Sequence, residues 1–171
     1  MSLRSKVAGS QKGMVVFMNI AYFLRTKSEV AYLYEDFTLR QALEKMRYHG
    51  YTAIPVLTRK NKYIGTISEG NFLWYLIEDE EDQEALYKIN MQSIENTMIR
   101  DVIKIGIDKN PPVRITATME ELLSRALDQN FIPVIDDRDY FIGIITRRDI
   151  IKYFNNSDRA NLPEPIAASK R

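Results

Sequence analysis

Residues 53–56 read Ala-Ile-Pro-Val and residues 131–134 read Phe-Ile-Pro-Val, so one short apolar stretch occurs twice, 78 residues apart. In each copy a glycine follows the proline by ten residues, inside a second apolar stretch. When residues 53–77 are aligned with residues 131–155, seven of 25 positions are identical. A fixed spacing of this kind indicates an internal duplication.

The residues around these stretches predict the same order of elements in both copies. Apolar side chains recur at spacings of three and four over residues 39–46, which is typical of an amphipathic helix. Thr38 suits the cap of this helix, Gly50 the left-handed position beyond its end, and Asn61 a hairpin turn. The order β-α-β-β-α is expected at residues 30–34, 39–46, 53–57, 63–67 and 72–77, and again at 113–115, 119–127, 132–135, 141–145 and 147–154.

These patterns predict an α+β fold. One copy is too small to cover both faces of its own sheet. Two β-α-β-β-α repeats packed sheet to sheet, with pseudo-twofold symmetry, bury surface that neither buries alone. The seam between them is expected to carry two similar clefts, which are a common place for small ligands.

The remaining segments are expected to flank or connect the two repeats. The acidic run at residues 78–84 predicts a solvated connector, and Pro163 and Pro165 predict a loose tail. The expected organisation is a flexible leader or tag at 1–18, the first repeat at 19–80, a connector at 81–100, the second repeat at 101–155 and a flexible tail at 156–171.

Composition narrows the class of protein. The chain of 171 residues has 24 Lys or Arg and 23 Asp or Glu, a net charge of +1, which argues against a nucleic-acid binder that relies on bulk charge. The absence of cysteine excludes disulfides, thiolate zinc sites and cysteine nucleophiles, and it favours the reducing cytoplasm. The apolar stretch at residues 14–24 is shorter than the about 20 residues that span a membrane. We expect a cytoplasmic protein with no membrane or nucleic-acid partner.

The segment Gly-Ile-Ile-Thr-Arg-Arg-Asp, residues 143–149, carries the most informative polar groups. A buried strand is expected to end just before Thr146, and the free backbone N–H groups at the start of the next helix favour an anion. The Thr146 hydroxyl suits a phosphate, and Arg147 or Arg148 adds a planar charged fork. Asp149 can accept two hydrogen bonds from a ribose diol. The segment therefore predicts a site for a phosphate and a sugar.

The same residues also have an explanation that needs no ligand, because Thr146-x-x-Asp149 is a helix-capping pattern. In the first repeat Ser68 and Asn71 can cap equally well, but Glu69 would repel a phosphate and Asn71 is a weaker acceptor for a diol. Capping is thus expected in both repeats, and the anion-binding features are expected in the second repeat alone. This asymmetry favours a ligand in the second repeat.

The tandem layout, the two Ile-Pro-Val strands, and the glycine followed by Ser or Thr and then Asn or Asp resemble a pair of CBS domains, a Bateman module, over residues 19–155. The resemblance implies an adenosine-nucleotide sensor in which the Asp of one repeat holds the ribose and the first core strand of the other cups the adenine. The implied site places Ile144, Thr146, Arg147, Arg148 and Asp149 against Tyr51, Thr52 and Ala53. A second, weaker cleft would place Ser68 and Asn71 against Asn130, Phe131 and Ile132.

The resemblance further implies a stand-alone, bacterial-type regulatory module that binds AMP, ADP, ATP or cyclic di-adenylate, with no catalysis and no cofactor. A homodimer formed through helices, and a separate regulated protein, are expected. His49 is the only histidine, and the chain has neither a ligand cluster at metal spacing nor a Gly-rich phosphate loop. The alternative is a structural interaction module whose clefts stay empty, and nucleotide binding distinguishes the two.

Overall fold

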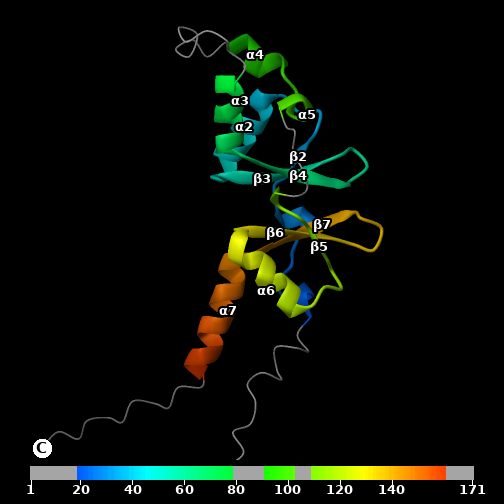
Figure 1. The fold of residues 1–171 in the computed structure, drawn as a ribbon, viewed down its shortest axis with the longest axis vertical. Coiled ribbons are helices and arrows are strands. Elements are labelled where there is room, and N and C mark those ends of the chain that lie inside the picture. The colour runs from blue at the N-terminus through cyan, green and yellow to red at the C-terminus, as the bar shows by residue number, and fades with distance from the viewer. Residues whose placement is uncertain (1–18, 79–90, 103–108, 161–171) are drawn as a thin grey trace, which may run out of the picture.

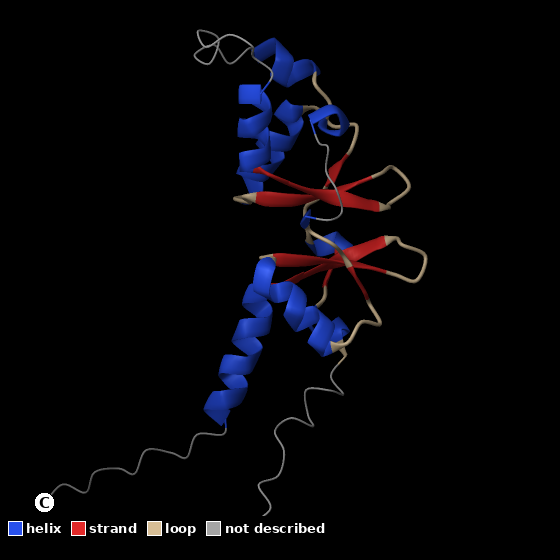
Figure 2. Ribbon diagram, in the orientation of Figure 1, coloured by secondary structure: helices blue, strands red, loops and turns tan. Residues whose placement is uncertain are grey.

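The computed structural model describes residues 19–78, 91–102 and 109–160. They form two halves, each a small β-sheet with helices on its outer face, and the two sheets face each other (Figure 1, Figure 2). The predicted α+β fold and sheet-to-sheet packing are confirmed. The predicted leader, the first half of the predicted connector and most of the predicted tail lie outside the described residues.

Both halves contain the predicted order of elements. The first half holds β2 (Leu33–Tyr34), α2 (Leu39–His49), β3 (Ala53–Leu57), β4 (Tyr63–Ser68) and α3 (Glu69–Glu78). The second half holds β5 (Val113–Arg114), α6 (Met119–Asp128), β6 (Phe131–Ile135), β7 (Phe141–Thr146) and α7 (Arg147–Ala160). Helix α7 runs on into the segment predicted as a tail, because no glycine or proline interrupts residues 147–160.

Short-range signals set the ends of these elements. The Thr38 side chain accepts a hydrogen bond from the Gln41 N–H at 3.3 Å, and the Gln41 side chain accepts one from the Thr38 N–H at 3.0 Å. This reciprocal capping box starts α2. Gly50 ends α2 with a φ of 65°, and Asn61 turns the β3–β4 hairpin with a φ of 60°. The predicted cap, helix end and turn are confirmed.

Equivalent strand ends lie at one edge of the molecule. In the first sheet, of order β2-β3-β4, Ala53 lies opposite Ser68 in the antiparallel pair of β3 and β4. In the second sheet, of order β1-β7-β6-β5, Phe131 lies opposite Thr146 in the antiparallel pair of β6 and β7. Because α3 and α7 start directly after β4 and β7, their first turns lie at this same edge, on the left in Figure 1.

Residues 20–26, which come before the β-α-β-β-α elements of the first half, pack on the second half. The short 3-10 helix η1 (Ile20–Phe23) buries Ile20 and Phe23 in the core of the second half. Strand β1 (Arg25–Thr26) then pairs antiparallel with β7, and a further 3-10 turn, η2 (Lys27–Glu29), leads into the first half. Neither β1 nor its pairing was predicted from the sequence.

In the same way, two helices that follow the first half in sequence complete its core. The two helices involved are α4 (Met91–Asn96) and α5 (Ile99–Val102). Although they lie next to the second repeat in sequence, Ile94 and Ile99 are buried in the core of the first half. The backbone of residues 97–100 is hydrogen-bonded to the backbone of residues 35–39. Residues 20–26 thus complete the second half, and residues 91–102 complete the first half. The predicted repeat boundaries stay a prediction.

The inner faces of the two sheets meet in an apolar seam cluster. Its buried members are Val30, Leu57, Tyr63, Ile135 and Phe141. The rings of Tyr63 and Phe141 stack with centroids 6.2 Å apart and planes at 22°. Since these two residues occupy equivalent positions in the repeats, their contact lies at the pseudo-twofold axis. The Tyr63 hydroxyl donates to the Asn110 carbonyl at 2.8 Å, and burial raises the pKa of this phenol above its ordinary value.

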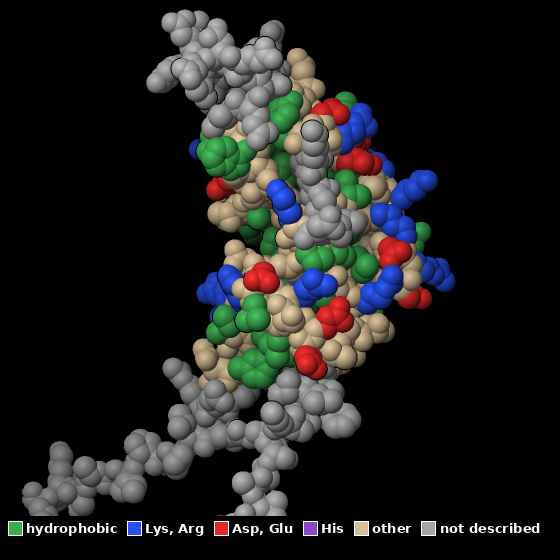
Figure 3. Space-filling view, in the orientation of Figure 1, with side chains coloured by type: hydrophobic (Ala, Val, Ile, Leu, Met, Phe, Trp, Pro, Cys, Tyr) green, Lys and Arg blue, Asp and Glu red, His purple; other side chains and the backbone are tan. Residues whose placement is uncertain are grey.

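Charged side chains of both signs gather at the edge opposite α3 and α7, over the ends of the two hairpins (Figure 3). Ion pairs at this edge join Arg59 to Asp36 at 2.9 Å and Arg114 to Asp139 at 2.6 Å. Because their side chains are largely exposed, these pairs contribute little to stability. The polar first turns of α3 and α7 lie at the other edge, away from the hairpins.

Candidate functional site

The first turns of α3 and α7 are closed by the predicted side-chain caps. In α7 the Thr146 hydroxyl donates to Asp149 Oδ2 at 2.7 Å, and the Asp149 N–H donates to Thr146 Oγ1 at 3.1 Å. In α3 the Ser68 hydroxyl donates to Asn71 Oδ1 at 2.8 Å, and the Asn71 N–H donates to Ser68 Oγ at 3.3 Å. The capping prediction is therefore confirmed in both repeats.

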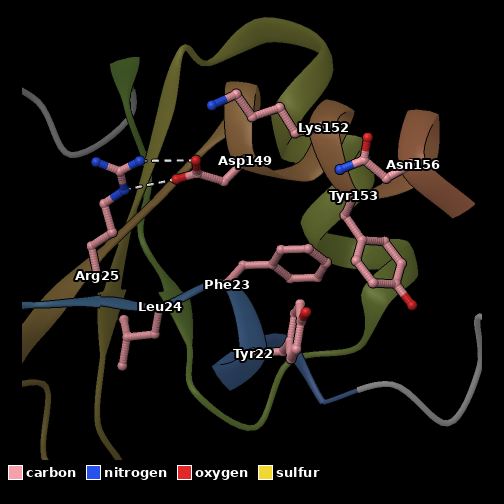
Figure 4. Close-up of a pocket in the computed structure, with 8 residues that line it drawn as sticks. All are labelled: Tyr22, Phe23, Leu24, Arg25, Asp149, Lys152, Tyr153 and Asn156. Carbon is pink, nitrogen blue, oxygen red and sulfur yellow. Dashed lines mark hydrogen bonds and ion pairs between the residues drawn. The ribbon is translucent and has the colours of Figure 1, made fainter.

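The Asp149 carboxylate has a partner that sequence reasoning missed. Arg25, from strand β1, donates from Nε to Asp149 Oδ2 at 2.7 Å and from Nη2 to Oδ1 at 2.8 Å (Figure 4). The two side chains are 52% and 22% exposed, so this bidentate pair lies at the surface, with the carboxylate as its more enclosed member.

This contact sets the electrostatics of the carboxylate. The hydrogen bond from the Arg25 guanidinium is the main cause that lowers the pKa of Asp149 below its ordinary value. The Thr146 hydroxyl lowers that pKa further, while partial burial opposes the change. The hydrogen bond to Asp149 in turn raises the pKa of Arg25. At neutral pH Asp149 is an anion held between a guanidinium and a hydroxyl.

A pocket of about 620 Å³ opens beside this ion pair. Residues 22–25, here called the N-terminal segment, form one wall, and one face of α7 forms the other (Figure 4). The residues that line the pocket are Tyr22, Phe23, Leu24, Arg25, Asp149, Lys152, Tyr153 and Asn156. Its volume lies in the range of small-molecule sites, about 300–1,000 Å³.

The pocket has a charged end and an aromatic end (Figure 4). At the charged end, Arg25 and Lys152 bring two cations to the single carboxylate of Asp149. At the other end, three rings contact one another edge to face with centroids 5.2 to 5.5 Å apart, those of Tyr22, Phe23 and Tyr153. Such a pocket suits a ligand with an anionic group and a flat ring.

The other predicted residues of the second repeat take different positions. Ile144 lies opposite Arg25 in the pairing of β1 with β7, and its side chain packs against the seam cluster. Arg148 is exposed. Arg147 donates to the carbonyls of Ala126 and Leu127 at the end of α6, at 3.4 and 3.3 Å. The Arg147 side chain thus caps α6, and any role in ligand binding for it stays a prediction.

Of the three predicted residues of the first repeat, Tyr51 lies near the same ion pair. The Tyr51 phenol is close enough to Arg25 to contribute to the raised pKa of that guanidinium. Its ring stacks on His49 with centroids 5.4 Å apart. Thr52 is exposed and Ala53 is half-buried at the start of β3. Their contact with a ligand stays a prediction, and none of these three residues lines the pocket beside Asp149.

The residues of the second predicted cleft are partly used by the fold. Ser68 and Asn71 bond to each other in the cap of α3. The Asn130 side chain accepts a hydrogen bond from Arg147. The Ile132 side chain is fully buried in the core of the second half, whereas Phe131 is half-buried. This cleft also stays a prediction.

The described ranges contain neither a metal site nor a membrane span. No group of three or more His, Asp or Glu side chains there is placed to hold a metal ion. No helix in the same ranges is long and apolar enough to cross a membrane.

One signal for the missed pocket is present in the sequence. The four residues that α7 contributes, at positions 149, 152, 153 and 156, recur at spacings of three and four, so they share one helix face. The sequence did not predict that residues 22–25 line the pocket. A strand of two residues shows no periodicity, and its partner strand is far away in sequence.

Comparisons with known proteins agree with this architecture. The sequence matches the CBS domain family over residues 24–78 and 94–156. It is 28% identical over 153 residues to the cyclic di-AMP receptor B of Bacillus subtilis, covering 88% of this chain and 95% of that protein. The structure of the CbpB protein of Listeria monocytogenes in complex with c-di-AMP matches with a TM-score of 0.71 at 24% identity, covering 84% of this chain and 100% of that one.

The structure of CBSX2 in complex with AMP also matches, with a TM-score of 0.63 at 17% identity, covering 82% of this chain and 98% of that one. The family match spans both halves of the fold and more than half of the chain. The chain therefore belongs to the CBS domain family and contains two CBS repeats.

Proposed function

We propose that this protein is a non-catalytic, cytoplasmic regulatory module that binds an adenine nucleotide beside Asp149 and signals to a separate partner protein. The observation that carries the proposal is the ionised Asp149 carboxylate on the wall of a 620 Å³ pocket, next to two cations and three aromatic rings. The Bacillus subtilis relative is named as a receptor for cyclic di-AMP, and the similarly folded CBSX2 structure holds AMP. AMP, ADP, ATP and cyclic di-adenylate are therefore the ligands to test.

The chemistry of the pocket supports a contact for each polar part of such a ligand. A ribose hydroxyl donates to Asp149, and phosphate oxygens accept from Arg25, Lys152 and the exposed Arg148. The adenine ring lies either against the aromatic end of the pocket or toward Tyr51, where the first repeat approaches the ion pair. The Thr146 hydroxyl keeps the first turn of α7 in place.

In this proposal, a ligand signals by changing how close the two walls of the pocket lie to each other. One wall is the N-terminal segment and the other is α7, so a ligand that contacts both favours the arrangement in which they are close together. Because a ligand shifts an equilibrium only by its differential affinity for two states, the free protein must also sample a state in which the segment lies further from α7. The regulated protein would distinguish these states.

A homodimer is part of the same proposal. Leu73 and Trp74 on α3 are 54% and 61% exposed, and Ile151 on α7 is 51% exposed. Both helices lie on the same side of the molecule (Figure 1). Large apolar side chains exposed together on one side favour association with a second copy through α3 and α7. Sedimentation of the wild type and of the Trp74→Glu variant tests this part, with loss of the dimer expected in the variant.

The alternative, a structural interaction module with empty clefts, is tested by ligand-induced stabilisation. A nucleotide at 100 times its dissociation constant stabilises the folded state by about 2.7 kcal/mol. We expect at least one adenine nucleotide to raise the melting temperature accordingly, with the affinity then measured by calorimetry. No shift with AMP, ADP, ATP or cyclic di-adenylate would favour the empty module.

A matched pair of variants locates the site. Asp149→Asn removes the charge, and Asn71 in the equivalent turn of α3 demonstrates that an amide maintains this cap. We therefore expect Asp149→Asn to fold normally and to lose most nucleotide binding. Asn71→Ala weakens a cap, at about 1 kcal/mol, and is expected to retain binding. Equal losses of affinity in both variants would overturn the assignment to Asp149.

A further inference from the structure

We infer that Arg25 is a specificity-determining residue, which makes the Asp149 pocket discriminate against an uncharged nucleoside and in favour of the nucleoside phosphate. The inference rests on the proposed function and deepens it, because it concerns the class of ligand at the same pocket. The Asp149 carboxylate already accepts three side-chain hydrogen bonds, two of them from Arg25.

An ionised carboxylate accepts about four hydrogen bonds, two on each oxygen. Asp149 Oδ2 already accepts two of them, one from Arg25 Nε at 2.7 Å and one from the Thr146 hydroxyl at 2.7 Å. Asp149 Oδ1 accepts one from Arg25 Nη2 at 2.8 Å. One acceptor position therefore remains, on Oδ1. A ribose diol that donates to both oxygens must displace one of the present donors.

Arg25 is the donor that can leave. Thr146 belongs to the same helical turn as Asp149 and also accepts the Asp149 N–H at 3.1 Å, so the cap of α7 holds its hydroxyl beside the carboxylate. The Arg25 side chain is 52% exposed and extends from a strand of two residues, which is held by backbone pairing with β7 and does not need the guanidinium. A bound diol is therefore expected to take the place of one Arg25 donor.

The displaced guanidinium then discriminates between ligands. An uncharged nucleoside breaks a bidentate charge-assisted contact and offers Arg25 nothing in return. A phosphate on the same ribose offers the guanidinium a new bidentate acceptor, and Lys152 in the same pocket supplies a second cation. The nucleoside has to compete with Arg25 for Asp149. The nucleotide also displaces Arg25 from Asp149, but its phosphate then binds the displaced guanidinium.

Calorimetry with adenosine and AMP on four proteins tests this: the wild type, Arg25→Ala, Arg25→Gln and Lys152→Ala. We expect Arg25→Ala to bind adenosine more tightly than the wild type and AMP less tightly, so that the preference for AMP falls by about tenfold or more. Arg25→Gln should behave likewise, since glutamine cannot replace the charged fork. Lys152→Ala, the matched control, should weaken AMP without improving adenosine, because no hydrogen bond from Lys152 to Asp149 has to be broken.

The possible failures are distinguishable. If Arg25→Ala and Lys152→Ala weaken AMP alike and leave adenosine unchanged, Arg25 acts as a general positive charge and the inference is overturned while the proposed function stands. Cyclic di-adenylate has one free hydroxyl on each ribose and fits the position left on Oδ1. If the wild type binds only that ligand, no displacement is needed, and again the inference alone is overturned. If the wild type binds no adenine nucleotide, the proposed function and the inference fail together.

Discussion

A β-carbon on residue 143 would lie 2.0 Å from the carbonyl oxygen of Arg25, a distance that no real side chain tolerates. Strand β1 approaches β7 this closely because Gly143 has no side chain, with Thr26 opposite Gly143 in the pairing. The position of Arg25, and with it the wall of the pocket beside Asp149, therefore depends on the glycine of the second repeat.

Gly143→Ala is expected to force β1 away from β7. The clash is with backbone, which cannot rotate away as a flexible side chain does, so we expect a loss of about 1–3 kcal/mol in the free energy of unfolding. We also expect loss of nucleotide binding, since residues 22–25 form one wall of the pocket. Urea denaturation and calorimetry measure the two effects.

Gly50→Ala is the control, because it strains a left-handed position with open space around it, at about 1–2 kcal/mol, and should leave binding intact. Wild-type affinity in Gly143→Ala would contradict this account.

Arg25→Gln is expected to raise the pKa of Asp149 toward its ordinary value of 3.8. Because this pKa is lowered in the folded state, the ion pair stabilises the fold above the unfolded pKa, and that contribution is lost as the pH falls through the folded pKa. At neutral pH we expect the wild type to be more stable than Arg25→Gln by about 0.2–1 kcal/mol, since the pair is exposed. Below both pKa values the difference should vanish.

Carboxyl NMR of Asp149 and urea denaturation between about pH 7 and about pH 2 measure these two quantities. The control is Lys152→Gln, which removes a more distant charge and should change the pKa of Asp149 less than Arg25→Gln does. An unchanged pKa in Arg25→Gln would show that the guanidinium is not paired with this carboxylate in solution.

Ile99→Ala and Ile20→Ala test the exchange of segments between the halves. Both side chains are fully buried, so each truncation is expected to cost about 2–5 kcal/mol. The part of the structure that each truncation destabilises distinguishes the two variants better than the total loss of stability does. Hydrogen exchange should increase first in α2 for Ile99→Ala and first in α6 for Ile20→Ala, because these helices share a core with the truncated side chain. The opposite pattern would mean that each segment packs on the repeat next to it in sequence.

Tyr63→Phe is expected to weaken the seam without opening a cavity. The change removes the hydroxyl that donates to the Asn110 carbonyl at 2.8 Å and lies 2.9 Å from the Thr66 hydroxyl. The loss of a buried hydrogen bond should lower the free energy of unfolding by about 1–3 kcal/mol, measured by urea denaturation. Tyr48 is 86% exposed, so Tyr48→Phe is the matched control and should change stability very little. Equal stability of the two variants would argue against the Tyr63 contact.

Local signals in the sequence were sufficient for most of the fold. The apolar spacing of α2, the Thr38 cap and Gly50 act within one helix, and each is confirmed in place. The duplication added long-range information, since the two Ile-Pro-Val strands predicted two equivalent sheets whose inner faces meet. These features were predictable because they depend on neighbours in sequence or on the repeat itself.

The site was predictable in part. Thr146 and Asp149 were identified because the cap and the predicted ligand need the same residue types at the same spacing. Arg25 was not, because it reaches Asp149 through a strand of two residues whose partner lies more than a hundred positions away in the chain. Arg147 shows what a sequence pattern omits: its charge predicts a phosphate contact, which stays a prediction, and no pattern in the sequence indicated that its guanidinium also reaches the carbonyls at the end of α6.

The exchange of the segments before each repeat has a consequence for biosynthesis. During translation, α2, β3 and β4 are synthesised before Ile94 and Ile99. The core of the first half therefore lacks these two side chains until residue 99 has been added. The second repeat has its completing residues, Ile20 and Phe23, available from the outset. The pocket beside Asp149 joins residues 22–25 to residues 149–156, so it exists only once translation has passed this part of α7.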